Sequence, residues 1–148
     1  TKAMKRVFSV DPNLKSMNNI DKHMKKMLVQ PKDSNLTVKC VSKNNISNLK
    51  MKIDKELWRI MLGEIISNAK KHNHKKNIDL IFEFDKDKQL NRLTIYYYNT
   101  GTPGKVKFLR RRGGLAIIKK IIELHGFSIQ PRENDNNFNF EIIIPLKI

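Results

Sequence analysis

The stretch from Glu64 to Asn73 brings together side chains that suit phosphate and magnesium chemistry. It lies within a segment that begins near Glu56, where apolar residues recur every three or four positions, as on a helix with one buried face. Glu64 and Asn68 are four residues apart and Lys71 follows one turn later, so a carboxylate, an amide oxygen and an ammonium line one side of that helix. Oxygen ligands suit Mg²⁺, and a lysine neutralises phosphate charge. An ordinary polar helix face gives the same pattern.

A second group of residues suits a flat ligand. Asn99 and Gly101 follow a predicted strand, and a glycine there lets the backbone approach a ring such as a purine. The Asn99 side chain could hydrogen-bond the exocyclic amine of adenine. A plain Asn/Gly turn is the alternative interpretation.

The segment after this turn suits an anion. The residues from Lys105 to Arg112 include no acidic residue, and Gly113 and Gly114 then open a predicted helix. Free N–H groups and the dipole at a helix N-terminus attract anions, and preceding arginines add positive charge. A solvated basic loop is the alternative.

The elements that position these groups alternate between strands and helices. Two helices are predicted, the one near Glu56–Ala69, with Asp54 as its N-cap, and the one ended by Gly126 as its C-cap. The Asp85–Asn91 stretch is predicted to turn between two strands of a hairpin. The predicted strands are Leu36–Val41, Leu49–Ile53, Ile78–Phe84, Leu93–Tyr98, Phe127–Gln130 and Phe138–Pro145. This order favours an α+β fold, a two-layer sandwich with helices on one face of a largely antiparallel sheet.

Residues 1–33 are predicted to form a connector or an added N-terminal helix, followed by one domain at 34–148. Asn18–Val29 could form a short helix that Pro31 stops. His23 lies in this stretch without a second histidine nearby, which favours an exposed or packed side chain over a ligand.

The composition is that of one globular domain. The chain has 148 residues, 39% of them hydrophobic, which suffices for a core. It has no apolar run near 18 residues and no signal peptide. Cys40 is the only cysteine, which excludes an internal disulfide and a cysteine-rich metal site and fits a reducing compartment. The start at Thr1, without methionine, suggests a piece of a longer protein.

The formal net charge is +16, from 30 Lys and Arg against 14 Asp and Glu. Such a charge permits binding to nucleic acid, an anionic membrane surface or an acidic protein. The basic residues are spread along the chain, without a long basic run or regularly interleaved aromatic residues. A general Lys/Asn/Ile bias of the composition explains the charge equally well.

Four stretches together resemble the GHKL ATPase superfamily, and within it the C-terminal catalytic domain of bacterial sensor histidine kinases. Leu62–His72 is similar to the N box, Ile95–Gly101 to the first glycine box, Gly113–Gly126 to the second glycine box with its helix, and Phe138–Pro145 to the last strand. Each motif is weak alone, but four in the right order and spacing are specific. The match spans roughly residues 36 to 146.

The resemblance implies a Bergerat ATP-binding fold, with a mixed sheet under helices and a site for ATP and Mg²⁺. By position, Asn68 would ligate the Mg²⁺ that bridges the phosphates, Lys71 would contact phosphate, and His72 would lie beside the nucleotide. Glu64 falls where the superfamily places the carboxylate that orients or activates the attacking group. Catalysis would then depend on positioning and on charge neutralisation.

The sequence departs from the family pattern on the adenine and lid side. Asn99 stands where an aspartate usually reads the adenine amine, and its amide carbonyl can still accept that hydrogen bond. The lid between Gly101 and Gly113 is short, and arginines 110–112 replace the early glycines of the second box. The remaining nucleotide-binding residues implied there are Arg112, Gly113, Gly114 and Leu115.

The resemblance implies transfer of the γ-phosphoryl group of ATP to a histidine on a separate upstream domain, because this chain has no phosphoacceptor motif. It also implies a downstream response regulator, a dimer of the full-length protein, and a cytoplasmic position in a membrane-anchored protein. No nucleic-acid partner is expected. The alternatives are a degenerate, non-catalytic GHKL domain that serves as a binding module and a GHKL serine kinase of the anti-sigma type.

Overall fold

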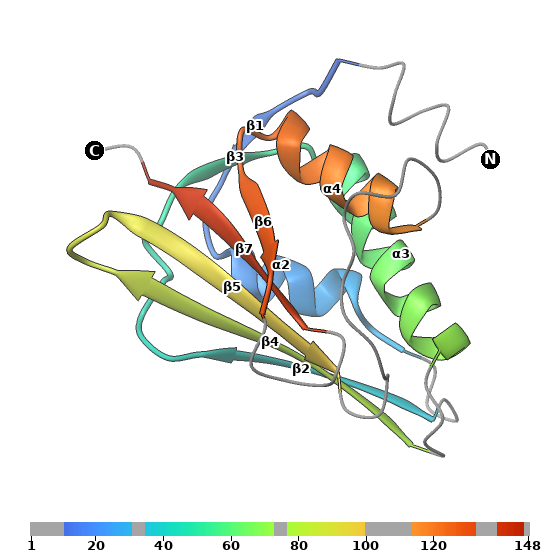
Figure 1. Ribbon diagram of the computed structural model, residues 1–148. Coiled ribbons are helices and arrows are strands. Elements are labelled where there is room, and N and C mark those ends of the chain that lie inside the picture. Colours follow the sequence, from blue (N-terminus) through green and yellow to red (C-terminus); the bar gives the residue numbers. More distant parts are fainter. Residues whose placement is uncertain (1–10, 31–34, 73–76, 100–113, 133–138, 147–148) are drawn as a thin grey trace.

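A computed structural model describes residues 11–30, 35–72, 77–99, 114–132 and 139–146 of the chain (Figure 1). All statements below concern these residues. The elements in chain order are β1 (Lys15–Met17), α2 (Ile20–Met27), β2 (Leu36–Ser42), β3 (Met51–Ile53), α3 (Lys55–His72), β4 (Ile78–Asp87), β5 (Arg92–Asn99), α4 (Gly114–Leu124), β6 (Ser128–Pro131) and β7 (Phe140–Pro145).

The main sheet has five strands in the order β2-β4-β5-β7-β6. Strand β2 runs parallel to β4, and every other neighbouring pair is antiparallel. The helices lie on one face of this sheet (Figure 1). The predicted α+β sandwich, with its mixed and largely antiparallel sheet, is therefore confirmed.

Alternation along the strands explains why the sheet has one covered face. In β4, Ile78, Leu80, Phe82 and Phe84 are buried, while the residues between them are only partly buried. Successive side chains of a strand point to opposite faces, so these four residues meet the helices. The apolar faces of α3 and α4 complete the core, and fully buried Trp58 is its largest side chain.

The start of α3 and the end of α4 are capped as the sequence predicts. The Asp54 carboxylate oxygen Oδ1 accepts hydrogen bonds from the backbone N–H groups of Glu56 and Leu57, each at 3.1 Å, which is N-cap geometry. At the end of α4, Gly126 has a φ of 75°. The Gly126 N–H donates to the Glu123 carbonyl, and the Phe127 N–H donates to the Ile122 carbonyl. These two bonds form a Schellman motif, which explains the glycine.

The structure differs from the sequence prediction at several strands. The predicted strand at 49–53 is shorter and stays outside the main sheet, because β3 pairs with β1, a strand that was not predicted. Strand β4 continues through Asp87, so the predicted turn at 85–91 is shorter than expected. Strand β6 begins at Ser128, one residue later than predicted, because Phe127 completes the Schellman motif.

The N-terminal region contributes to the same core. The predicted helix at 18–29 is present as α2, and its Ile20, Met24 and Leu28 are buried among the core residues. His23 is half-buried. The described residues contain no group of three or more His, Cys, Asp or Glu that could hold a metal ion, so His23 belongs to no such group. The division between a connector and a domain at residue 34 stays a prediction. No helix of the described ranges is long and apolar enough to cross a membrane.

Candidate functional site

The polar side of α3 presents the three side chains that the sequence singled out. Glu64 and Asn68 are half-buried and Lys71 is exposed. Buried Ile65 and Ala69 hold the neighbouring side of the helix in the core, which fixes the direction of the polar side. His72 is the last residue of α3, and its side chain lies outside the described residues. A carboxylate and an amide therefore stand one turn apart at the edge of the core.

Asn99 occupies the last position of β5 and is buried, with 1% of its surface exposed. It lies opposite Leu80 of β4 in the antiparallel register. Its backbone N–H donates to the Asn139 side-chain oxygen at 3.4 Å, a contact at the long limit for a hydrogen bond. Asn139 is itself 4% exposed, immediately before β7. Two neighbouring amide side chains are thus buried where the central strands end.

Tyr97 supports Asn99 from two residues earlier on the same strand face. Its ring lies between Phe82 and Phe140, with ring centroids 5.1 Å and 4.8 Å away. Burial raises the pKa of the Tyr97 hydroxyl, and the nearby Asn99 side chain acts in the opposite direction. The aromatic stack therefore fixes the Tyr97 ring near the Asn99 side chain.

The helix of the second glycine box packs directly against α3. Helix α4 begins at Gly114, followed by half-buried Leu115, and in Figure 1 it lies beside α3. Its C-terminal end is tied to the start of α3 by His125. The Asp54 backbone N–H donates to His125 Nε2 at 3.0 Å, and His125 Nδ1 lies 2.7 Å from the Ile121 carbonyl oxygen. Gly101, Arg112 and Gly113 lie outside the described residues.

Sequence reasoning assigned α3, β5 and α4 to one site. In the structure α3 and α4 pack against each other on one face of the sheet, and β5 is the central strand of that sheet. It missed Tyr97, Asn139 and His125 as supports. Tyr97 carried a signal, because it shares a strand face with Asn99. Asn139 carried none, since a polar residue out of phase with the inward set normally faces solvent.

The donor set fits a magnesium nucleotide. Within the described part of the chain there is no cluster of three or more His, Cys, Asp or Glu that could hold a metal alone. The oxygens of Asn68 and Glu64 are the kind of isolated ligands that Mg²⁺ uses when phosphates and water complete its coordination. The buried amide of Asn99 is a polar group in an apolar surround, which is the kind of group that fixes a ligand's orientation in small-molecule sites.

Comparisons with known proteins agree with this arrangement at the level of the fold. No protein-family model matches the sequence, and no curated protein matches it. Solved histidine kinase structures do resemble it. The catalytic domain of the histidine kinase ThkA is 19% identical with a TM-score of 0.63, and the match covers 90% of this chain and 97% of that one. Acinetobacter baumannii AdeS is 17% identical with a TM-score of 0.67, over 99% of this chain and 75% of AdeS.

Two larger structures match over a smaller part of their length. ShkA, solved at full length in complex with AMPPNP, is 15% identical with a TM-score of 0.70, and the match covers 97% of this chain and 34% of ShkA. ThkA in complex with the response regulator protein TrrA is 17% identical with a TM-score of 0.59, over 90% of this chain and 42% of that one. The chain thus has the fold of histidine kinase catalytic domains, and the predicted Bergerat fold is confirmed.

Proposed function

We propose that this chain is the ATP-binding catalytic domain of a two-component sensor histidine kinase. It transfers the γ-phosphoryl group of ATP to a histidine side chain on a separate domain. The observation that carries the proposal is the polar side of α3, where Glu64 and Asn68 stand half-buried one turn apart on a fold shared with such domains. The apolar side of α3 is packed into the hydrophobic core, so these polar side chains are held on a rigid element.

Each polar residue of α3 has a separate role in this proposal. The Asn68 side-chain oxygen would hold the Mg²⁺ of the nucleotide, and this ion would neutralise phosphate charge. Lys71 is exposed at the end of the same side, and its long flexible ammonium reaches phosphate oxygens without a fixed geometry. His72 follows it beside the nucleotide.

Glu64 is the candidate catalytic carboxylate. It accepts a hydrogen bond from the N–H of the incoming imidazole and so directs the other ring nitrogen at phosphorus. The bond between the γ-phosphorus and the bridging oxygen breaks, a phosphorus–nitrogen bond forms, and ADP leaves with the electron pair. Positioning and charge neutralisation carry most of such a reaction.

Asn99 is the candidate adenine-reading residue. Its side-chain carbonyl accepts a hydrogen bond from the exocyclic amine, and its contact with Tyr97 limits rotation of the amide. Gly101 would allow the ring to approach the backbone. Arg112, Gly113, Gly114 and Leu115 would enclose the phosphates, with the N-terminus of α4 as part of the anion site.

The partners follow from the same proposal. The phosphoacceptor histidine lies on another domain of a dimeric, membrane-anchored protein, and a response regulator receives the phosphoryl group from it. The AMPPNP bound to ShkA and the response regulator bound to ThkA are the precedents among similar folds. The alternative is a non-catalytic binding module, which the replacement of the usual aspartate by Asn99 favours.

Calorimetric titration of the 148-residue chain with a non-hydrolysable ATP analogue, with and without Mg²⁺, tests the proposal. We expect binding that requires Mg²⁺ and that weakens at least about tenfold in Asn68→Ala. A polar contact with a charged group is worth roughly 1.5–3 kcal/mol, and the variant loses the contact between the Asn68 oxygen and the ion. Ser67→Ala, at an exposed position on the same helix, is the control and should bind like the native chain. An absence of binding at millimolar nucleotide would contradict the kinase proposal. Binding that ignores Asn68→Ala would refute the role of that residue alone.

A further inference from the structure

Strand β2 forms an open edge of the main sheet. Among the described residues its one neighbour in the sheet is β4, to which it is parallel. The Ile78 N–H donates to the Asn35 carbonyl and the Lys43 N–H donates to the Phe84 carbonyl. In a strand, backbone groups of successive residues point to opposite edges, so the odd-numbered residues from 35 to 43 pair with β4. Val38, Cys40 and Ser42 consequently direct their N–H and C=O groups outward.

The other edge of the sheet is much less suited to pairing. Strand β6 has four residues, Ser128–Pro131, and it ends in a proline, which has no N–H to donate. Strand β2 has seven residues, Leu36–Ser42, and contains no proline. A further strand can therefore be added at β2 but not readily at β6.

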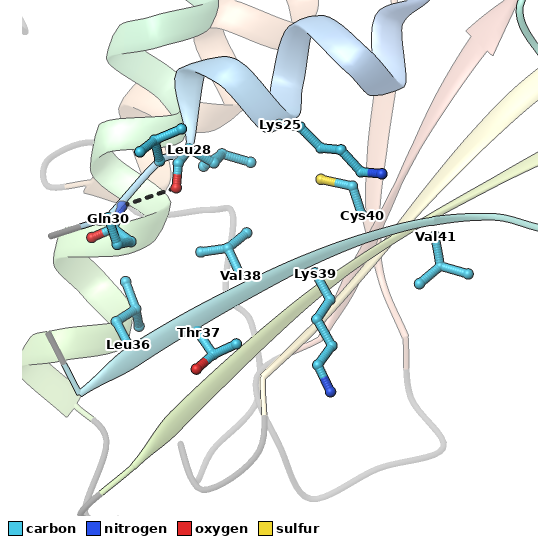
Figure 2. Close-up of a pocket in the computed structure, with 10 residues that line it drawn as sticks. Lys25, Leu28, Gln30, Leu36, Thr37, Val38, Lys39, Cys40 and Val41 are labelled. Carbon is cyan, nitrogen blue, oxygen red and sulfur yellow. Dashed lines mark hydrogen bonds between the residues drawn. The ribbon is translucent and has the colours of Figure 1, made fainter. Parts of the chain in front are cut away.

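A groove of about 670 Å³ follows this edge between β2 and the end of α2 (Figure 2). Leu28, Val29 and Gln30 line one side and Leu36–Val41 line the other. Val29 is 75% exposed and Val41 is 48% exposed, and they are two of the three large hydrophobic side chains that are exposed among the described residues. These two exposed valines border the edge of β2, where an added strand would cover part of their apolar surface.

The two faces of the edge differ in chemistry. Figure 2 shows Val38 and Cys40 pointing toward α2, and Lys39 and Val41 pointing away from it. Burial raises the pKa of the Cys40 thiol to about 11, so this side chain is neutral and adds to the apolar lining. The face toward α2 thus suits apolar side chains, while Lys39 suits a carboxylate on the other face.

The surroundings of the groove are strongly basic. Helix α2 carries Lys22, Lys25 and Lys26 against one acid, Asp21, which accepts a hydrogen bond from the Ser42 hydroxyl. A second copy of this chain is disfavoured as the occupant, because edge-to-edge pairing of β2 would bring lysine toward lysine on a chain of net charge +16. The positive charge around the groove attracts an acidic partner and repels a basic one.

We propose that the β2–α2 groove binds an extended acidic segment of a partner protein, which adds a sixth strand at β2. Its backbone pairs with the outward groups of Val38, Cys40 and Ser42, its apolar side chains enter the groove on the side of α2, and its carboxylates face Lys39 on the other side. Backbone bonds provide affinity in this mode, and alternate side chains provide specificity. The proposal concerns a surface separate from the nucleotide site and does not depend on the proposed function.

The probe is a fluorescently labelled eight-residue peptide of alternating glutamate and valine, titrated into the 148-residue chain and followed by anisotropy. The control peptide has the same residues with N-methyl groups on alternate amides, which keeps the charge but prevents strand pairing. We expect the control to bind at least about tenfold more weakly, since it loses several hydrogen bonds of roughly 1 kcal/mol each. Equal binding of both peptides would overturn the proposal.

Two variants locate the site. Val38→Pro removes an outward N–H while the β4 pairing of its neighbours is kept, and it should weaken peptide binding about tenfold. Lys39→Glu should weaken it by a similar factor through charge reversal, whereas Lys52→Glu, an equal change of charge at an exposed position of β3, should have little effect. Should Val38→Pro fail to fold, the comparison of Lys39→Glu with Lys52→Glu decides. Equal effects of those two variants, or self-association of the native chain through β2, would overturn the proposal.

Discussion

Replacement of His125 by phenylalanine tests how the two helices next to the site are held together. Phenylalanine keeps a ring of similar size, so the edge contact with Trp58 at 5.2 Å and the tilted contact with Phe127 at 5.5 Å persist. The two hydrogen bonds of the imidazole are lost. The variant therefore isolates hydrogen bonding from packing.

The magnitude follows from what each partner loses. The Ile121 carbonyl still accepts a bond from the His125 backbone N–H, at 3.3 Å. The buried Asp54 N–H, by contrast, loses its acceptor. An unsatisfied buried donor costs about 1–3 kcal/mol, and we expect the free energy of unfolding to fall by about 2 kcal/mol. Urea denaturation at pH 7.5, followed by the fluorescence of Trp58, the one tryptophan of the chain, measures this difference.

The dependence on pH provides an independent check. Burial lowers the pKa of His125 from its ordinary value of 6.5, against smaller opposing effects of the Ile121 carbonyl and Asp54. The unfolded chain therefore takes up this proton first, so the native protein loses stability as the pH falls below about 6.5. The loss approaches about 1.4 kcal/mol per pH unit until the folded pKa is reached, and the variant lacks it. His23, whose pKa is also lowered, contributes equally to both proteins and cancels. A variant as stable as the native chain, or one with the same pH slope, would refute the reasoning.

Four further substitutions test the caps and the adenine side. Asp54→Ala removes the oxygen that caps α3 and should lower the free energy of unfolding by about 1–2 kcal/mol in the same urea assay; no change would mean that water replaces the cap. Gly126→Ala should cost about 1 kcal/mol through its φ of 75°, while Gly63→Ala, in a helix with no atom near the added Cβ, should be neutral or stabilising by up to about 1 kcal/mol. The reverse order would contradict the C-cap assignment. Asn99→Asp should preserve or tighten binding of the ATP analogue in calorimetry, and a large loss would show that the amide NH₂ is the group used.

The sequence was sufficient for elements whose signals are local. Alternation in β4, the apolar spacing of α3, the Asp54 cap and the Gly126 cap each follow from neighbouring residues, and each is present in the structure. Helix α2 was predicted for the same reason. Local signals thus predicted most of the fold and the orientation of the Glu64–Asn68 side.

Pairing between distant segments could not be predicted in this way. Strand β1 has three residues, too few for a periodic pattern, and it forms because β3 offers a partner. Buried Asn139 accepts a hydrogen bond from the backbone of Asn99, which lies 40 residues earlier. Likewise His125 is fixed by Asp54, 71 residues away. These supports of the site arise only when the sheet and helices are assembled.

The most direct test of the central claim is a nuclear magnetic resonance titration of the ¹⁵N-labelled chain with an ATP analogue and Mg²⁺. The account predicts saturable shifts of the Asn99 and Asn139 side-chain and backbone amides, and of the amides from Glu64 to Lys71, at nucleotide concentrations of millimolar or below. Amides of β2 should remain unchanged, because that edge lies outside the proposed nucleotide site. An absence of shifts at Asn68 and Asn99 at several millimolar nucleotide would contradict the claim that these elements form an ATP site.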